Sequence, residues 1–425
     1  MLDLKKGRVA PLTFIDLFAG AGGLSEGFVQ AGFEPIAHVE ADLAASFTLR
    51  TREAYYRLKS AGLSSQYDEY LSGRLSRTEL YKISQVPTRV INATIGQETL
   101  DQIFRQVDYL IGDCKPDLIV GGPPCQAYSL VGRARSELKM VGDKRNYLFL
   151  YYAEFLKRYK PKYFVFENVV GLLSAKEKEG RRYLDMMLSL FKDAGYSVEW
   201  KVLSAEKFGV PQKRKRIILV GKFGAESGFF PEIAEVDANF FVRDAIGDLP
   251  PIRAGEGTPY VTTVSAQPSP WLRQSGILAS NNKVTWHAAR PHNERDLSIF
   301  KEVVNRWVKL KERLSYDELP EKLKNHKNRT SFTDRFKVVA PDVSFSHTIV
   351  AHIAKDGNYY IHPDLTQNRS LTPREVARLQ TFPDDYFFES ASGQPSRTAA
   401  FKQIGNAVPV VLARRIAESI RRNWK

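Results

Sequence analysis

The chain has very little cysteine: among its 425 residues only Cys114 and Cys125 occur. Two thiols are too few for a disulfide framework or a four-thiolate metal site, so a cysteine that matters here acts singly. The sequence also lacks an uninterrupted apolar run of about 18 residues, and its start has no apolar segment followed by a cleavage site. We therefore expect no membrane span and no secretory signal, and a cytoplasmic protein.

The balance of charge is positive, with 62 Lys and Arg against 48 Asp and Glu and a net charge of +14. A hydrophobic fraction of 43% excludes a disordered chain, because it can bury enough apolar surface to offset chain entropy. Excess cations favour a polyanionic partner such as nucleic acid, although solubility alone would also explain them. Residues 251–340 carry 16 Lys and Arg against 9 Asp and Glu, so half of the net charge lies in this stretch.

Short apolar runs alternate with helical patterns from Pro11 to about Val220. The runs LTFIDLFAG, FEPIAHVE, PDLIVGG, YFVFENV and RIILVG are typical of buried strands. Their alternation with amphipathic segments predicts an α/β fold in which helices cover both faces of a parallel sheet. The polar residues that end the strands should then share one rim, where such sheets bind ligands.

The chain divides into three parts by composition. The α/β pattern occupies residues 1–224 and is interrupted by a helical insertion at about 50–87. A region rich in Gly, Pro, Ser and Thr follows, which predicts a second domain over 225–368. From residue 369 the helical pattern returns, with Thr372 as an N-cap and Pro373 at the first helical position, and the chain ends in a basic helix that begins near Pro409.

The segment FIDLFAGAGGLSEGF places a glycine-rich turn between a strand and a helix. Glycines suit a tight turn and let backbone N–H groups approach a ligand closely. The spacing departs from GxGxxG, which disfavours a dinucleotide, and Glu40 ends the next strand, where it could bind ribose hydroxyls. The turn predicts a nucleoside-containing cofactor, and an ordinary strand–helix turn stays open as the alternative.

Three reactive groups are expected on the same rim. Cys125 follows a buried strand in a rigid GGPP turn, and Glu167 and Asn168 end another strand. Arg214 and Arg216 enter a further strand at alternate positions, so we expect them to point to one face. A thiol, a carboxyl and two guanidiniums can together polarise a heteroaromatic ring, although Glu167 could equally be a helix cap or part of a surface ion pair.

Other candidate residues are given structural roles. Cys114 has no comparable setting and is interpreted as a packing residue. His287 and His292 have no third histidine or cysteine partner nearby, so we expect them to form hydrogen bonds, and we expect no metal.

Six segments, taken in order, resemble the motifs of the DNA (cytosine-5)-methyltransferases: DLFAGAGGLSEGF, GGPPCQAYS, FENV, QKRKR, RSLTPREVARLQTFPDDY and QIGNAVP. The resemblance covers both ends of the chain. It implies a Rossmann-like, S-adenosylmethionine-dependent methyltransferase domain with a mixed, mostly parallel sheet over 1–224. It further implies a smaller, irregular target-recognition domain over 225–368 and a return to the catalytic domain over 369–425.

The resemblance also implies a covalent mechanism. Cys125 would attack C6 of a cytosine flipped out of duplex DNA, while Glu167 hydrogen-bonds or protonates N3. C5 would then accept the methyl group of S-adenosylmethionine and leave S-adenosylhomocysteine as product. Arg216, with Arg214 nearby, would hold the O2 side of the ring, and Asn168 would orient the turn at Glu167.

Cofactor and DNA contacts are carried over residue by residue. Where many family members have Asp-Ile near the adenine, this chain has Thr94-Ile95, which leaves that hydrogen bond in doubt. Val131 lies where the family's mobile loop can fill the gap left by the flipped base. The implied cofactor residues are Phe18, Ala19, Gly20, Gly22, Leu24, Glu40, Thr94, Ile95, Pro123, Leu148 and Asn406. The implied DNA contacts are Gln126, Ser129, Val131, Arg133, Arg135 and Arg369.

Two alternatives stay open at the level of sequence. The same fold could methylate RNA, such as tRNA, or it could serve as a non-catalytic DNA-binding regulator. The compact chain is similar to prokaryotic modification enzymes, which implies a nucleoid-associated monomer that protects DNA against a separately acting restriction endonuclease or works as a solitary enzyme.

Overall fold

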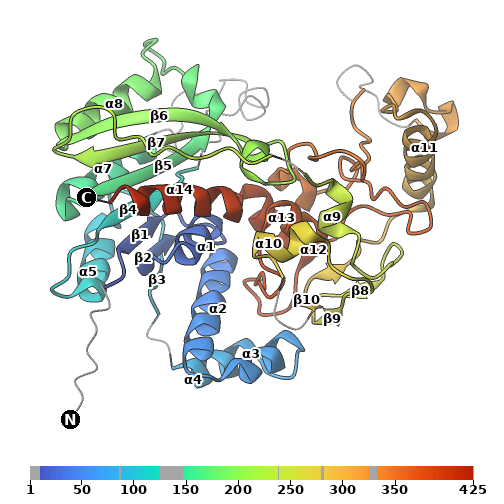
Figure 1. Cartoon of the computed structure of the whole chain (residues 1–425), viewed down its shortest axis with the longest axis horizontal. Helices are drawn as coiled ribbons and strands as arrows, with labels where there is room; N and C mark the ends of the chain where they lie inside the picture. The colour runs from blue at the N-terminus through green and yellow to red at the C-terminus, as the bar shows by residue number, and fades with distance from the viewer. Residues whose placement is uncertain are drawn as a thin grey trace.

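The computed structural model describes residues 10–85, 88–124, 147–237, 239–278, 282–324 and 333–424. Its centre is a seven-stranded sheet with the order β3-β2-β1-β4-β5-β7-β6 (Figure 1). The strands are β1 (Thr13–Leu17), β2 (Glu34–Glu40), β3 (Val90–Asn92), β4 (Leu118–Gly121), β5 (Tyr163–Val169), β6 (Tyr196–Ser204) and β7 (Lys215–Phe223).

The sheet is mixed and mostly parallel. Strands β1 to β5 pair in parallel, whereas β7 runs antiparallel to both β5 and β6. This direction matters for the site, because it brings the first residues of β7 to the carboxyl end of β5, with Arg216 opposite Val169. If β7 ran parallel to β5, Arg216 would lie at the other end of the strands, away from Glu167.

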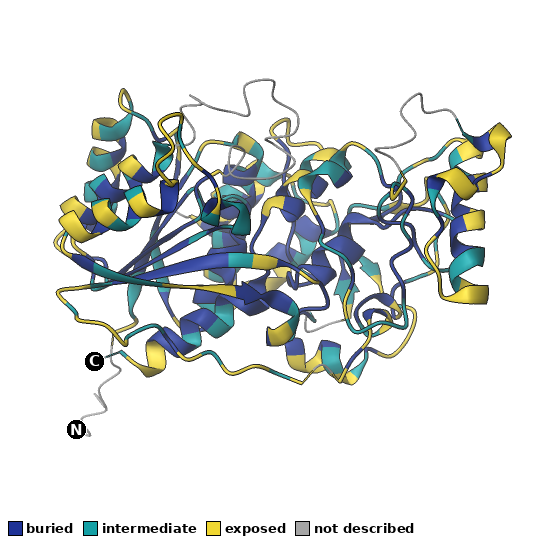
Figure 2. Ribbon diagram, turned by 90° about the horizontal axis from the view of Figure 1, so that it is seen from above, coloured by how far each residue is buried: buried dark blue, intermediate teal, exposed yellow. Residues whose placement is uncertain are grey.

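Helices cover both faces of the sheet, and the strands between them are largely buried (Figure 2). On one face, side chains such as Ile15 and Leu17 share a core with the three helices α5 (Leu100–Ile111), α7 (Leu148–Tyr159) and α8 (Tyr183–Asp193). On the other face, Phe14 lies in a core with α1 (Gly23–Gln30) and α14 (Val410–Arg422). Helix α14 begins directly after Pro409, as predicted.

The predicted insertion contains helices, but it begins differently. Helix α2 (Leu43–Ser60) starts directly after β2 and is capped by Asp42, so it belongs to the strand–helix rhythm. The added helices are α3 (Ser64–Leu71) and α4 (Arg77–Ser84). Tyr67 and Tyr70 of α3 lie in one hydrophobic core with residues that follow position 242, so the insertion is joined to the far part of the chain.

Beyond β7 the chain forms short elements, as the composition of 225–368 predicts. The longest is α11 (Glu294–Leu310), which has a small core of its own at the far end of the molecule from the sheet (Figure 1). The others are α9 (Val242–Ile246), β8 (Gly257–Thr258), β9 (Thr262–Thr263), α10 (Pro270–Ser275), β10 (Lys283–Val284), β11 (His287–Ala288) and the 3-10 turns Tyr316–Glu318, Glu321–Leu323 and Ala351–Ala354.

The carboxyl-terminal part adds α12 (Pro373–Leu379), α13 (Arg397–Asn406) and α14. Thr372 caps α12 with Pro373 at its first position, which confirms the prediction, and Glu375 completes a capping box. The core that holds α12 and α13 also includes residues of α3 and α9. The three parts of the chain therefore share one core, and their boundaries stay predictions.

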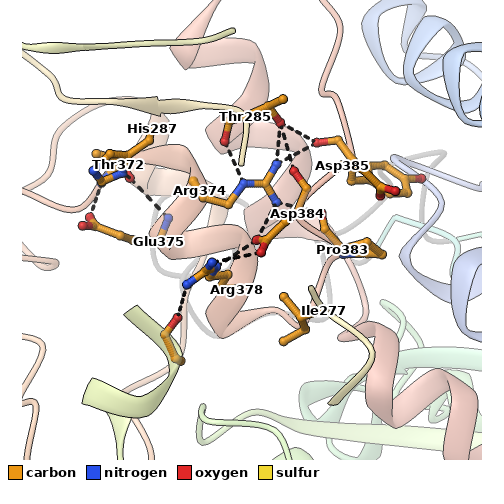
Figure 3. Close-up of polar contacts among 12 residues, drawn as sticks. Ile277, Thr285, His287, Thr372, Arg374, Glu375, Arg378, Pro383, Asp384 and Asp385 are labelled. Atoms are coloured by element: carbon orange, nitrogen blue, oxygen red, sulfur yellow. Dashed lines mark hydrogen bonds and ion pairs between the residues drawn. The ribbon is translucent and has the colours of Figure 1, made fainter. Parts of the chain in front are cut away.

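Two buried arginines of α12 join these parts. Arg378 donates to Asp384 at 2.8 and 2.9 Å and also binds Asp248. Arg374 donates to the Thr285 side chain and carbonyl at 2.7 Å and to the carbonyls of Pro383 and Tyr386 at 2.8 Å. Figure 3 shows both guanidiniums beside the segment that contains Pro383 and Asp384. Helix α12 is thus bonded to both the region before it and the segment after it.

Candidate active site

A carboxylate and a guanidinium meet at the carboxyl end of β5. Arg216 Nε lies 2.6 Å from Glu167 Oε1, and each side chain is 13% exposed. The other Glu167 oxygen packs on the turn after β4, since a Cβ on Gly122 would lie only 2.7 Å from Oε2. A side chain at position 122 would force the carboxylate to shift. Glu167 is therefore held between a cation and the GGPP turn that leads to Cys125.

Asn168 ties the same turn to β5. Its side chain is buried, its Nδ2 donates to the carbonyl of Pro123 at 3.3 Å, and its Oδ1 accepts from the N–H of Val169 at 2.9 Å. These bonds fit the orienting role that the sequence suggested. Cys125 itself lies outside the described residues, as do Gln126, Ser129, Val131, Arg133 and Arg135.

Arg214 differs from its neighbour. The regular strand begins one residue later, at Lys215, and the Arg214 side chain is 1% exposed. Its guanidinium donates to the carbonyls of Ile349 at 2.6 Å and Gly405 at 3.2 Å. Arg214 therefore binds the backbone of two distant segments, whereas Arg216 is paired with Glu167.

The glycine turn is closed by the carboxylate at the end of β2. Glu40 accepts from the N–H of Gly20 at 2.7 Å and from the N–H of Asp42 at 2.6 Å. Burial raises the pKa of Glu40, and the two N–H groups partly offset this rise. Gly20 and Gly22 have φ angles of 56° and 79°, which favour glycine. A Cβ on Gly20 would meet no atom within 4 Å, so there is open space in front of the turn for a ligand.

The remaining candidate cofactor residues lie where strands end or helices begin. Phe18, Thr94 and Pro123 follow β1, β3 and β4, so they share the rim with Glu40. Ala19 and Ile95 are buried beside them, Leu148 is the first residue of α7, and Asn406 is the exposed last residue of α13. Leu24 is buried in the core with α14, which leaves its backbone rather than its side chain to face a ligand.

Arg369 lies inside the protein and not at its surface. Its side chain is fully buried, donates to both Glu375 oxygens at 2.7 Å and donates to the carbonyl of Ile252 at 2.9 Å. A guanidinium saturated in this way inside the protein has no donor left for a phosphate at the surface, so this arrangement lends no support to the predicted DNA contact.

Two further predictions can be compared with the structure. Cys114 is exposed, so its interpretation as a packing residue is wrong. The histidines do form hydrogen bonds, His287 with Thr372 Oγ1 at 3.2 Å and the Pro250 carbonyl at 2.8 Å, and His292 with Ser370 Oγ at 2.9 Å. In the described part of the chain, no helix has the length and apolar character needed to cross a membrane.

The ordered rim, with Glu167 and Arg216 on one side and the Gly20 turn on the other, can be compared with known proteins. The family model for C-5 cytosine-specific DNA methylase matches residues 12–62 and 92–422. The chain belongs to the C-5 cytosine-specific DNA methylases. The model passes over residues 63–91, the stretch that contains α3 and α4, so these two helices are additions to the family's common pattern.

Individual relatives of this DNA methylase support the same family assignment. It is 40% identical to the type II methyltransferase M.Bpa9945I of Bacillus paralicheniformis, over 96% of this chain and 98% of the relative. It is 31% identical to M.DdeI of Desulfomicrobium norvegicum, over 96% of this chain and 88% of the relative. The enzyme is therefore a DNA cytosine-5 methyltransferase of the type found in restriction–modification systems, as its sequence motifs implied.

Solved structures support the fold. A prophage-encoded protein of E. coli, described as a DNA modification methyltransferase, superposes with a TM-score of 0.61 at 22% identity, over 97% of this chain and 99% of that one. The Entamoeba histolytica methyltransferase EhMeth gives a TM-score of 0.56 at 13% identity, over 98% and 100% of the two chains. The predicted Rossmann-like fold with a mixed, mostly parallel sheet is confirmed.

Proposed function

We propose that this DNA methylase works through a covalent bond between Cys125 and C6 of a cytosine flipped out of duplex DNA. The observation that carries the proposal is the placement of Glu167, which Arg216 holds at 2.6 Å and which packs on Gly122, three residues before the cysteine. An acid and a cation beside the turn that leads to a cysteine meet the needs of a cytosine ring, which is too poor a nucleophile at C5 to react unaided.

The Cys125 thiolate forms a bond to C6, and a proton held on Glu167 moves to or is shared with N3, so that an electron pair becomes available at C5. S-Adenosylmethionine, when bound, supplies an electrophilic methyl group for that carbon. A base then removes the C5 proton, the electron pair of the broken C–H bond re-forms the C5–C6 double bond, the Cys125 thiolate leaves C6, and N3 returns its proton to Glu167. Arg216 offsets the charge that develops on the O2 side of the ring.

We infer that the cofactor lies in front of the Gly20 turn. The open space there and the placement of Glu40 by two backbone N–H groups fit a nucleoside ligand whose ribose hydroxyls can donate to the remaining carboxylate lone pairs. Phe18, Ala19, Gly22, Leu24, Thr94, Ile95, Pro123, Leu148 and Asn406 would surround its methionine and adenine parts. The chemistry needs no metal.

We further propose that the enzyme acts as a monomer and that its substrate is duplex DNA at the nucleoid. Its support is the charge of residues 251–340, which lie between the two catalytic parts of the chain. Gln126, Ser129, Val131, Arg133 and Arg135 would contact DNA from the loop after Cys125. The type II names of the relatives support a separately acting restriction endonuclease as the functional counterpart.

Labelled methyl incorporation tests the substrate directly. The purified enzyme, given S-adenosylmethionine labelled in its methyl group, should label duplex DNA and leave tRNA unlabelled. Sequencing of host DNA after expression, with single-base readout of methylated cytosine, should show one short recurrent sequence. Label in tRNA alone would contradict the proposal, as would methylation of cytosines without regard to their neighbours.

DNA affinity should depend steeply on salt. Each phosphate neutralised by Lys or Arg adds about −0.9 to the slope of log affinity against log salt, so six contacts would weaken binding about 10³-fold between about 50 and 200 mM. Titration of a fluorescent duplex at several salt concentrations measures the slope. A flat response would show that the excess of cations serves solubility and not DNA binding.

A further inference from the structure

The cofactor turn is held from behind by a residue near the other end of the chain. The hydroxyl of Tyr386 donates to the carbonyl of Ala21 at 2.6 Å, across 365 residues of sequence. Ala21 lies between Gly20 and Gly22, at the centre of the turn. The tyrosine ring is 1% exposed and packs on Phe382 and Phe388, with ring centres 4.9 and 5.4 Å away, so the position of its hydroxyl is fixed.

A buried ion cluster attaches the same segment to the helix that follows the turn. Arg52 of α2 donates to the two oxygens of Glu26 at 2.9 and 2.7 Å and to Asp385 at 2.9 Å. Glu26 belongs to the first turn of α1, and Asp385 is the neighbour of Tyr386. The turn and the start of α1 are thus both bonded to one short segment.

Side chains of α1, α2 and the segment around Tyr386 border the turn on this side. A cavity of about 720 Å³ lies behind it, and its walls include Gly22, Glu26, Leu49, Arg52, Tyr56 and Tyr386. A Cβ on Gly22 would lie 2.8 Å from both the Tyr386 hydroxyl and Leu49 Cδ2. Next to a hollow of this size, the hydrogen bond of Tyr386 contributes more to the placement of the turn than it would in a close-packed interior.

The other side of the segment is anchored to α12. Arg374 binds the carbonyls of Pro383 and Tyr386, and Arg378 binds Asp384, as Figure 3 shows for Pro383 and Asp384. The segment therefore has one set of bonds to α12 and a second set to the cofactor turn.

We propose that Tyr386 is a positioning residue for the cofactor: its hydroxyl keeps the carbonyl of Ala21 in place, so that the N–H groups and open face of the Gly20–Gly22 turn are ordered before the ligand arrives. This inference rests on the proposed binding of S-adenosylmethionine at the turn. Without the hydroxyl, a buried carbonyl loses its donor and the turn must be ordered at the moment of binding.

The test is Tyr386→Phe, which keeps the ring and removes only the hydroxyl. Calorimetric titration with S-adenosylhomocysteine should show a dissociation constant about five to ten times that of the wild-type enzyme. In turnover, KM for S-adenosylmethionine should rise by the same factor while kcat at saturating cofactor stays unchanged. A general loss of stability would not produce this split.

Tyr67→Phe is the matched control. Tyr67 is also buried and donates to the same segment, at the Asp385 carbonyl 3.0 Å away, but it does not touch the turn. The Tyr67→Phe variant should bind S-adenosylhomocysteine with the affinity of the wild-type enzyme. The inference is overturned if Tyr386→Phe binds S-adenosylhomocysteine as tightly as wild type, or if both variants weaken binding equally. A wild-type enzyme that binds no S-adenosylhomocysteine would instead refute the proposed cofactor site.

Discussion

Replacement of Cys125 by alanine is expected to lower the rate of methyl transfer by roughly 10⁴-fold or more. The variant cannot form the bond to C6, and without that bond C5 keeps the low nucleophilicity of an aromatic ring carbon. Single-turnover methylation of a duplex with labelled S-adenosylmethionine measures the loss. DNA affinity should change little, because the thiol contributes almost nothing to the contact area.

Cys114→Ala provides the matched control, since it removes the chain's other thiol from an exposed position. It should methylate at the wild-type rate. A duplex with 5-fluorocytosine at the target adds a second measurement: fluorine cannot leave as a cation, so the wild-type enzyme should remain covalently attached and the Cys125 variant should not. Methylation by Cys125→Ala at the normal rate would refute the covalent mechanism.

Glu167→Gln should lower kcat by about 10²- to 10⁴-fold, the range expected when an acid–base group is removed. The amide keeps the shape of the side chain but cannot give a proton to N3, and it leaves Arg216 without its carboxylate. Rapid-quench measurement of the methylation step, together with separate titrations of DNA and S-adenosylhomocysteine, separates a chemical defect from weaker binding.

Glu69→Gln is the control for Glu167→Gln, because it also breaks a carboxylate–arginine pair, that of Glu69 with Arg74, but at the exposed end of α3. It should leave all three measurements at wild-type values. If Glu167→Gln weakened DNA binding in proportion to kcat, the carboxylate would be a substrate-binding group and not the proton donor.

Within the seven-stranded sheet, the sequence predicted the five strands that consist of apolar runs and missed the other two. Strand β3 has only three residues, too short for a pattern, and β6 mixes exposed and buried positions because it lies at the edge of the sheet. The antiparallel direction of β7 could not be predicted from its apolar run either, because a run of apolar residues does not indicate which way a strand runs in the sheet. Arg216 was expected near Glu167 from its motif, and the reversed strand explains how it comes to be there.

The burial of three arginines is the feature that was hardest to predict from the sequence. Arg369 suggested a DNA contact, and Arg374 and Arg378 lie four residues apart on a helix, a spacing typical of a solvated face. All three are buried. Their partners include Asp248, Thr285 and Asp384 and several carbonyls, some of them more than 80 residues away. A charged residue can be recognised as internal only when such distant partners are known. The roles of Arg52 and Tyr386 could not be predicted for the same reason, since their partners are also distant in sequence.

Helix α14 has a consequence for synthesis of the protein. It is the last helix of the chain, yet it packs on α1 and completes the core on one face of a sheet whose first strand begins at Thr13. During translation this apolar face stays uncovered until residues 410–422 leave the ribosome. The glycine turn likewise lacks the hydroxyl of Tyr386 until residue 386 has been made. The contact between α1 and α14 is therefore formed late, because both segments must be present before the core on this face can close.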